Sequence, residues 1–120
     1  MKKVLVVEDV NVISSAIRLI LEKEGIDVIE NSDGTKVLNI IRNKKIDLVI
    51  LDLMMPGMSG AEIFELIKND ERIKKTKILI LTAKIDALKI NEKLKNCDCF
   101  MEKPFDNNVL VYEVKKLLNL

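Results

Sequence analysis

Short aliphatic runs recur along the chain and predict five β-strands. Residues 3–7, 47–51 and 78–81 form the strongest runs, with apolar side chains at almost every position. Strands that are apolar on both faces are typical of a parallel sheet that is covered on both sides. Two weaker candidates are residues 27–30, which alternate polar and apolar side chains as an edge strand would, and residues 99–101.

Between these runs the apolar residues recur every three to four positions, which is the spacing of an amphipathic helix. The pattern predicts helices around residues 13–21, 37–41, 63–67 and 109–118, and a weaker one over residues 84–95. Residues suited to capping or ending these helices stand beside them. They are Gly25, Ser32, Asp33, Gly60 and Asp106.

The alternation of strand and helix, repeated five times, predicts a doubly wound α/β domain with a five-stranded parallel sheet. A chain of 120 residues is long enough to bury a self-sufficient core. We therefore expect one domain over residues 1–120.

The composition excludes several classes of function. With 20 basic and 19 acidic residues the net charge is +1, which gives no global attraction for nucleic acid or anionic lipid. The longest aliphatic runs are far shorter than the roughly 20 residues needed to cross a bilayer, and the N-terminus lacks the features of a secretory signal. We expect a cytoplasmic protein. The absence of histidine removes Ser/His and Cys/His catalysis and His-ligated metal sites.

Polar side chains follow four of the five predicted strands. Glu8 and Asp9 follow the first strand, and Asp52 follows the third. Thr82 ends the fourth strand, and Lys103 follows the fifth. Because ligands of an open parallel sheet bind outside the carboxyl ends of its strands, these side chains predict a functional site at that edge.

The predicted site holds three acidic groups, Glu8, Asp9 and Asp52, and therefore needs a cation. Two like charges about 4 Å apart repel by roughly 4 kcal/mol at an effective dielectric constant near 20. Carboxylate oxygens without histidine or thiolate are ligands that suit Mg²⁺. A dication and Lys103 would bring the formal charge of the cluster to zero and could hold a phosphoryl group transferred to one of the carboxylates.

Four motifs at these strand ends resemble the receiver domain of two-component response regulators. They are VLVVED at residues 4–9, DLVILDLMMPGMSG at 47–60, LTAK at 81–84 and KPF at 103–105. The likeness runs in order from residue 2 to about residue 119. It implies a single receiver domain over residues 1–120, with a flavodoxin-like (βα)5 fold and the strand order 2-1-3-4-5.

The resemblance also implies roles for the acidic residues. Asp52 matches the residue that accepts a phosphoryl group from a histidine kinase or phosphotransfer protein. Glu8 and Asp9 match the acidic pair that holds Mg²⁺ together with Asp52, and the backbone carbonyl of Met54 matches a further ligand. Such a domain is not a conventional enzyme, although it assists its own phosphorylation and dephosphorylation at Asp52.

The remaining matched residues imply a switch. Thr82 matches the hydroxyl that turns toward the phosphoryl group, and Lys103 matches the lysine that pairs with it. Phe100 occupies the aromatic switch position, and the Lys103–Pro104 peptide bond is expected to be cis. The resemblance further implies a surface over residues 84–120 that binds a downstream protein or a second copy of the chain. We expect no direct nucleic-acid binding, because the local charge of residues 84–96 is too small to drive it.

Other interpretations remain open or are disfavoured by single residues. The chain can be a receiver fragment of a larger DNA-binding response regulator or of a hybrid kinase. A phosphohydrolase of the haloacid dehalogenase type would need a second aspartate at residue 54, where Met54 stands. A flavin module would need a hydroxyl-rich or glycine-rich loop after the first strand, and a dinucleotide-binding domain would need the G-x-G-x-x-G motif, which is absent.

Overall fold

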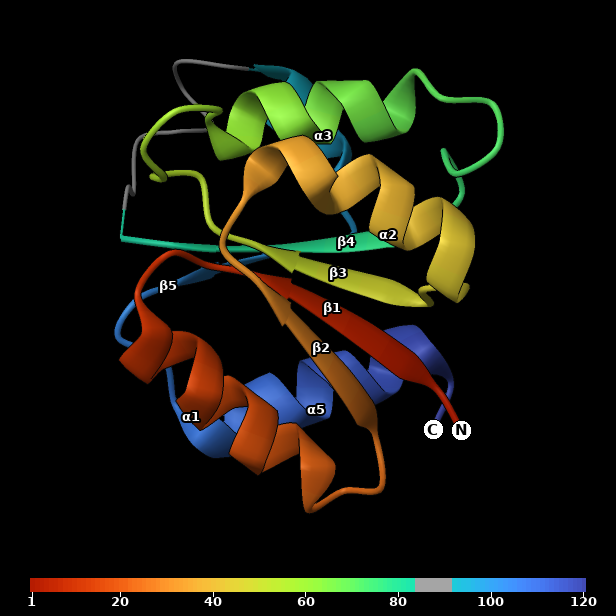
Figure 1. Ribbon diagram of the computed structural model, residues 1–120. Helices are drawn as coiled ribbons and strands as arrows, with labels where there is room; N and C mark the ends of the chain where they lie inside the picture. The colour runs from red at the N-terminus through yellow and green to blue at the C-terminus, as the bar shows by residue number, and fades with distance from the viewer. Residues whose placement is uncertain (84–91) are drawn as a thin grey trace.

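The computed structural model describes residues 1–83 and 92–120. The strands form one five-stranded parallel sheet in the order β2-β1-β3-β4-β5 (Figure 1). The strands are β1 (Lys3–Val7), β2 (Asp27–Asn31), β3 (Leu48–Leu51), β4 (Lys77–Thr82) and β5 (Cys99–Glu102). The predicted doubly wound, flavodoxin-like fold and its strand order are confirmed, and the two weaker strands are the two edges.

Helices cover both faces of the sheet, with α2 and α3 on one face and α1 and α5 on the other (Figure 1). The helices are α1 (Asn11–Glu22), α2 (Val37–Lys44), α3 (Gly60–Lys68) and α5 (Asn107–Leu118). Of the helix predicted over residues 84–95, residues 84–91 lie outside the described part, and the described end belongs to a 3₁₀ helix, Glu92–Asn96. In the described ranges no helix is both long and apolar enough to cross a membrane.

The core consists of two apolar layers, one on each face of the sheet. Successive strand residues point to opposite faces, so a strand buried on both sides must be apolar throughout. Leu5 and Val7 of β1 pack toward α2 and α3, whereas Val4 and Val6 pack toward α1 and α5. All four are fully buried. This double burial explains the aliphatic runs and holds the central strands rigidly in place.

Every strand except β1 differs from its predicted range by one residue at one or both ends. Asp47 lies just before β3, and its carboxylate accepts a hydrogen bond from the Lys3 backbone N–H at 2.8 Å, which ties the chain to the amino end of β1. At the other end of the sheet, β4 extends to Thr82 and pairs there with Glu102 of β5. Thr82 is therefore part of the sheet.

Predicted caps are present at two helix starts. The Asp106 carboxylate accepts hydrogen bonds from the backbone N–H groups of Asn108 and Val109 at the start of α5. Asp33 accepts from Thr35 at the start of the 3₁₀ helix Gly34–Lys36, which leads into α2. These bonds satisfy backbone donors that helix geometry leaves unpaired.

Gly60 sets the close approach of α3 to the end of β3. A Cβ atom at this position would lie 2.2 Å from the Asp52 carbonyl oxygen and 2.6 Å from the Leu53 Cα atom. The Gly60 N–H also donates to the Leu53 carbonyl oxygen at 3.1 Å. Residue 60 must therefore be glycine for the backbone that carries Asp52 to keep its path.

We expect Gly60→Ala to lower the free energy of unfolding by about 3 kcal/mol, because the methyl group must push against backbone that cannot move without disturbing β3. Gly57→Ala is the matched control, since Gly57 has a φ of +80° but nothing within 4 Å of its added Cβ. That variant should lose only about 1 kcal/mol from backbone strain. Urea unfolding measures both, and equal losses would contradict the steric argument.

Candidate functional site

The acidic residues at the ends of β1 and β3 come together. One carboxylate oxygen from each of Glu8, Asp9 and Asp52 lies within 4.8 Å of the others. The convergence follows from the sheet, because β1 and β3 are neighbours with Val7 opposite Leu51. Strands β1, β3 and β4 all end at the same edge of the sheet, on the left in Figure 1.

Glu8 is buried, and both of its carboxylate oxygens accept hydrogen bonds. Only 3% of its surface is exposed. Its Oε1 atom accepts a hydrogen bond from the Val10 backbone N–H at 3.2 Å, and its Oε2 atom accepts one from the Lys103 ammonium at 2.6 Å. Burial raises the pKa of Glu8 above its ordinary value, the Lys103 bond opposes the rise, and the charge of Asp52 adds to it.

Lys103 is the cation that bridges the cluster. Its Nζ atom lies 2.6 Å from Glu8 Oε2 and 3.3 Å from Asp52 Oδ2. Burial acts to lower the pKa of Lys103, but the hydrogen bond that its ammonium donates to Glu8 and the negative charges of Asp52 and Glu8 outweigh this effect and raise the pKa above its ordinary value. Lys103 therefore carries its positive charge at neutral pH. The following peptide bond, Lys103–Pro104, is cis.

Asp52 presents both of its carboxylate oxygens to donors. It is 5% exposed. Its Oδ1 atom accepts from the Met54 backbone N–H at 3.1 Å, and its Oδ2 atom accepts from Lys103. The Met54 side chain is exposed, so Met54 contacts the cluster through its backbone. This arrangement fixes the orientation of the Asp52 carboxylate.

Asp9 differs from the other two acids. Its Oδ1 atom is buried and accepts no hydrogen bond from residues 1–83 or 92–120. An unpaired buried carboxylate oxygen is unfavourable, so this atom indicates a missing partner. A divalent cation bound by oxygens would supply that partner, and the donor set of three carboxylates is of the kind that Mg²⁺ prefers.

The two predicted switch residues lie on neighbouring strands. Thr82 is fully buried at the carboxyl end of β4, at the same edge as the acids. Phe100 is half-buried in β5, pairs in register with Ile80 and packs against the core beneath α3. Phe100 therefore lies level with a residue two positions before Thr82, further from the carboxyl ends of the strands.

A polar network beside Glu8 was not predicted. The Ser14 hydroxyl donates to Glu30 Oε1 at 2.6 Å, and Arg18 donates to Glu30 Oε2 at 3.3 Å. The Ser14 bond is the main cause that lowers the pKa of Glu30. A cavity of about 140 Å³ lies here, between Glu8 and Asn31. The sequence gives no signal that pairs Ser14 with Glu30, because they lie on different elements 16 residues apart.

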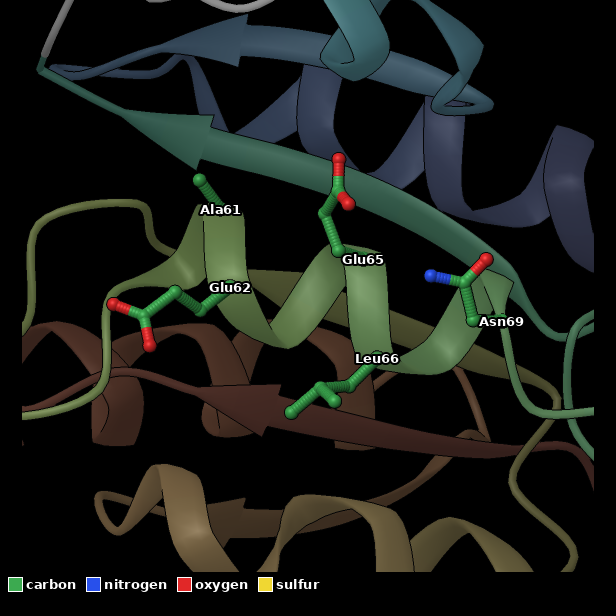
Figure 2. A pocket seen from close by; sticks show the side chains of 5 residues that line it. All are labelled: Ala61, Glu62, Glu65, Leu66 and Asn69. Carbon is green, nitrogen blue, oxygen red and sulfur yellow. The ribbon is translucent and has the colours of Figure 1, made fainter.

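A larger hollow, of about 500 Å³, lies against α3 and is lined by Ala61, Glu62, Glu65, Leu66 and Asn69 (Figure 2). Its polar side chains do not converge. Glu62 and Glu65 point in different directions in Figure 2. The strand-end cluster, where charged groups meet, is therefore the better candidate for chemistry.

Comparisons with known proteins agree with this geometry. Residues 4–115 match the family model described as "Response regulator receiver domain". The chain is 34% identical over 118 residues to the DNA-binding response regulator MtrA of Mycolicibacterium paratuberculosis, a match that covers 98% of this chain and 51% of MtrA. The chain thus spans about half the length of the curated relatives it matches.

Solved structures show the same fold. The receiver domain of the Francisella response regulator 1452 has a TM-score of 0.87 and 29% identity, with 99% of this chain and 98% of that chain covered. The receiver domain of the sensor histidine kinase PA1611 from Pseudomonas aeruginosa, described with a magnesium ion in its active-site cleft, has a TM-score of 0.89 and 22% identity, with coverages of 99% and 98%. From its family match and its fold, the chain belongs to the response regulator receiver domains.

Proposed function

We propose that Asp52 accepts a phosphoryl group from the phosphohistidine of a kinase or phosphotransfer protein. The observation that carries this proposal is the buried Asp52 carboxylate, fixed by the Met54 N–H and placed 3.3 Å from the Lys103 ammonium. An Asp52 oxygen attacks phosphorus, the bond from phosphorus to the histidine nitrogen breaks, and its electron pair remains on the imidazole. Phosphoryl transfer needs little more than such positioning and fixed positive charge.

The residues present fit a bound Mg²⁺. Glu8, Asp9 and Asp52 would hold it with their carboxylates, and Met54 with its backbone carbonyl. Support comes from the unpaired buried oxygen of Asp9 and from the convergence of all three acids. When bound, the ion neutralises negative charge on the phosphoryl oxygens. Lys103 adds a second positive charge from the opposite end of the chain.

Phosphorylation would change the charge at the end of β3 and draw Thr82 toward the phosphoryl group. Space vacated by Thr82 would favour a different placement of Phe100 on the neighbouring strand. We infer that this change reaches a protein partner or a second copy of the chain through the surface over residues 84–120. Of that surface, residues 84–91 lie outside the described part.

A second form of the proposal is favoured by one observation. MtrA is named as DNA-binding, and this chain aligns with half of its length. Residues 1–120 would then act as the phosphorylated half of a longer regulator in which another domain contacts DNA. In both forms the receiver itself binds proteins, so residues 1–120 alone should show no tight, salt-sensitive DNA binding.

Incubation with acetyl phosphate and Mg²⁺ should add one phosphoryl group to the protein, and Asp52→Asn should abolish the addition because the nucleophile is lost. Intact mass spectrometry measures the product. Asp27→Asn is the control, since Asp27 is a half-buried aspartate at the amino end of β2, the end of the sheet opposite Asp52, and its loss should leave labelling unchanged. Equal labelling of the Asp52→Asn variant would move the acceptor to another residue.

Asp9→Asn should raise the stability of the metal-free protein by about 1 kcal/mol, because it removes an unpaired charge from the acidic cluster. The same change should abolish the stabilisation by Mg²⁺, which for the unaltered protein reaches about 2.7 kcal/mol at 100 times the dissociation constant. Urea unfolding with and without Mg²⁺ tests both effects. A variant that keeps the full Mg²⁺ increment would exclude Asp9 as a ligand.

A further inference from the structure

A cavity of about 330 Å³ lies at the amino ends of the strands, the end of the sheet opposite the acidic cluster. It lies between the end of α2 and the segment that leads into β4, on the right in Figure 1. Its lining combines apolar and basic side chains. The apolar ones are Ile41, Ile46 and Ile73, and the basic ones are Arg42, Lys45 and Arg72.

Asp70 arranges two of the basic side chains. Its side chain is only 10% exposed. The Arg42 guanidinium donates to Asp70 Oδ2 from Nε at 3.0 Å and also from Nη2. The Arg72 backbone N–H donates to Asp70 Oδ1 at 2.9 Å, and the Arg72 Nε atom lies 3.8 Å from the same oxygen. One nearly buried carboxylate therefore holds two guanidinium groups from different segments beside one cavity.

The charge of this cluster is not balanced. The hydrogen bond from Arg42 lowers the pKa of Asp70, so this carboxylate is ionised at neutral pH. The three cations that line the cavity and this one carboxylate give a formal charge of +2. The negative end of the α2 dipole favours a basic residue in the last turn of that helix, but it does not explain Arg72, which comes from the segment before β4.

The cations also have donors to spare. In residues 1–83 and 92–120, the Lys45 ammonium and the Arg72 guanidinium donate no side-chain hydrogen bond, and Arg72 is 70% exposed. Lys45 ends α2 with a φ of 52°, a left-handed position that glycine usually takes. A charged side chain thus occupies a position that backbone conformation alone would give to glycine.

We propose that this cavity binds a small phosphate monoester. Arg42, Lys45 and Arg72 would hold the phosphate, and the three isoleucines would contact the organic group. A phosphate monoester carries a charge of about −1.5 to −2 at neutral pH, which matches the charge of the cluster. The planar guanidinium group suits phosphate oxygens. The volume is at the lower end of the roughly 300–1,000 Å³ that small-molecule sites occupy. This inference does not depend on the proposed function of Asp52.

The test uses phenyl phosphate as the probe, without Mg²⁺, so that the acidic cluster offers it no metal ion. Backbone amide NMR signals of residues 41–46 and 70–76 should shift together, with a dissociation constant on the order of 1 mM. The amides of Asp9 and Asp52 are the internal control and should not respond. Shifts centred on Asp9 and Asp52 instead would overturn the assignment of the cavity.

Arg72→Gln should weaken phenyl phosphate binding about tenfold, because it removes a charged donor to the phosphate. Its exposed side chain makes this change unlikely to disturb the fold, which the amide spectrum verifies. Lys75→Gln is the matched control, since Lys75 is an exposed residue of the same segment that does not line the cavity. It should bind within about twofold of the unaltered protein. Equal weakening in both variants would show attraction by net charge alone and would overturn the site.

Two further ligands test the chemical class. Phenyl sulfate has a similar shape but a single negative charge, so it should bind about tenfold more weakly than phenyl phosphate. Equal affinity for the two would exclude recognition of a dianion. A phosphoserine peptide should bind no more tightly than phenyl phosphate, and a clear preference for the peptide would overturn the small ligand in favour of a phosphorylated protein. None of these results bears on the labelling of Asp52 by acetyl phosphate.

Discussion

Repulsion among three carboxylates is the constraint on which the rest of this structure depends. Glu8, Asp9 and Asp52 are held within 4.8 Å of one another, and two of them are almost fully buried. In a flexible chain, repulsion would move these carboxylates apart. The cluster persists because β1 and β3 are buried on both faces and cannot separate without opening both apolar layers.

The positive charge that partly neutralises these acids comes from a residue distant in the sequence. Lys103 lies 95 residues after Glu8, and β4 and β5 must both be in place before its ammonium can reach the acids. The ion pair therefore joins the first and last strands of the sequence at one edge of the sheet. This explains why the site does not form from any local segment, and why its geometry depends on the whole strand order.

The sequence predicts some of these features well because they follow from periodicity. Strand-end acids must meet when their strands are parallel neighbours, so Glu8 and Asp52 are brought together by the fold itself. Other features depend on the positions of atoms to within a few tenths of an ångström. The preference of Lys103 for Glu8 over Asp52, and the contact that requires Gly60, arise from backbone paths that no residue pattern encodes. The Ser14–Glu30 bond is of the same kind.

The balance of charge also suggests why such a site suits signalling. The metal-free cluster has a formal charge of −2, a dication would bring it to zero, and an acyl phosphate on Asp52 would add about one further negative charge. Small changes of charge in a site buried from water have large energetic effects. Thr82 is buried at the same edge, and Phe100 follows on the next strand, so a charge change at Asp52 is adjacent to side chains that can repack. A phosphoryl group on Asp52 would therefore place new negative charge beside Thr82, and the free energy of its interactions with neighbouring donors is what would drive a conformational response.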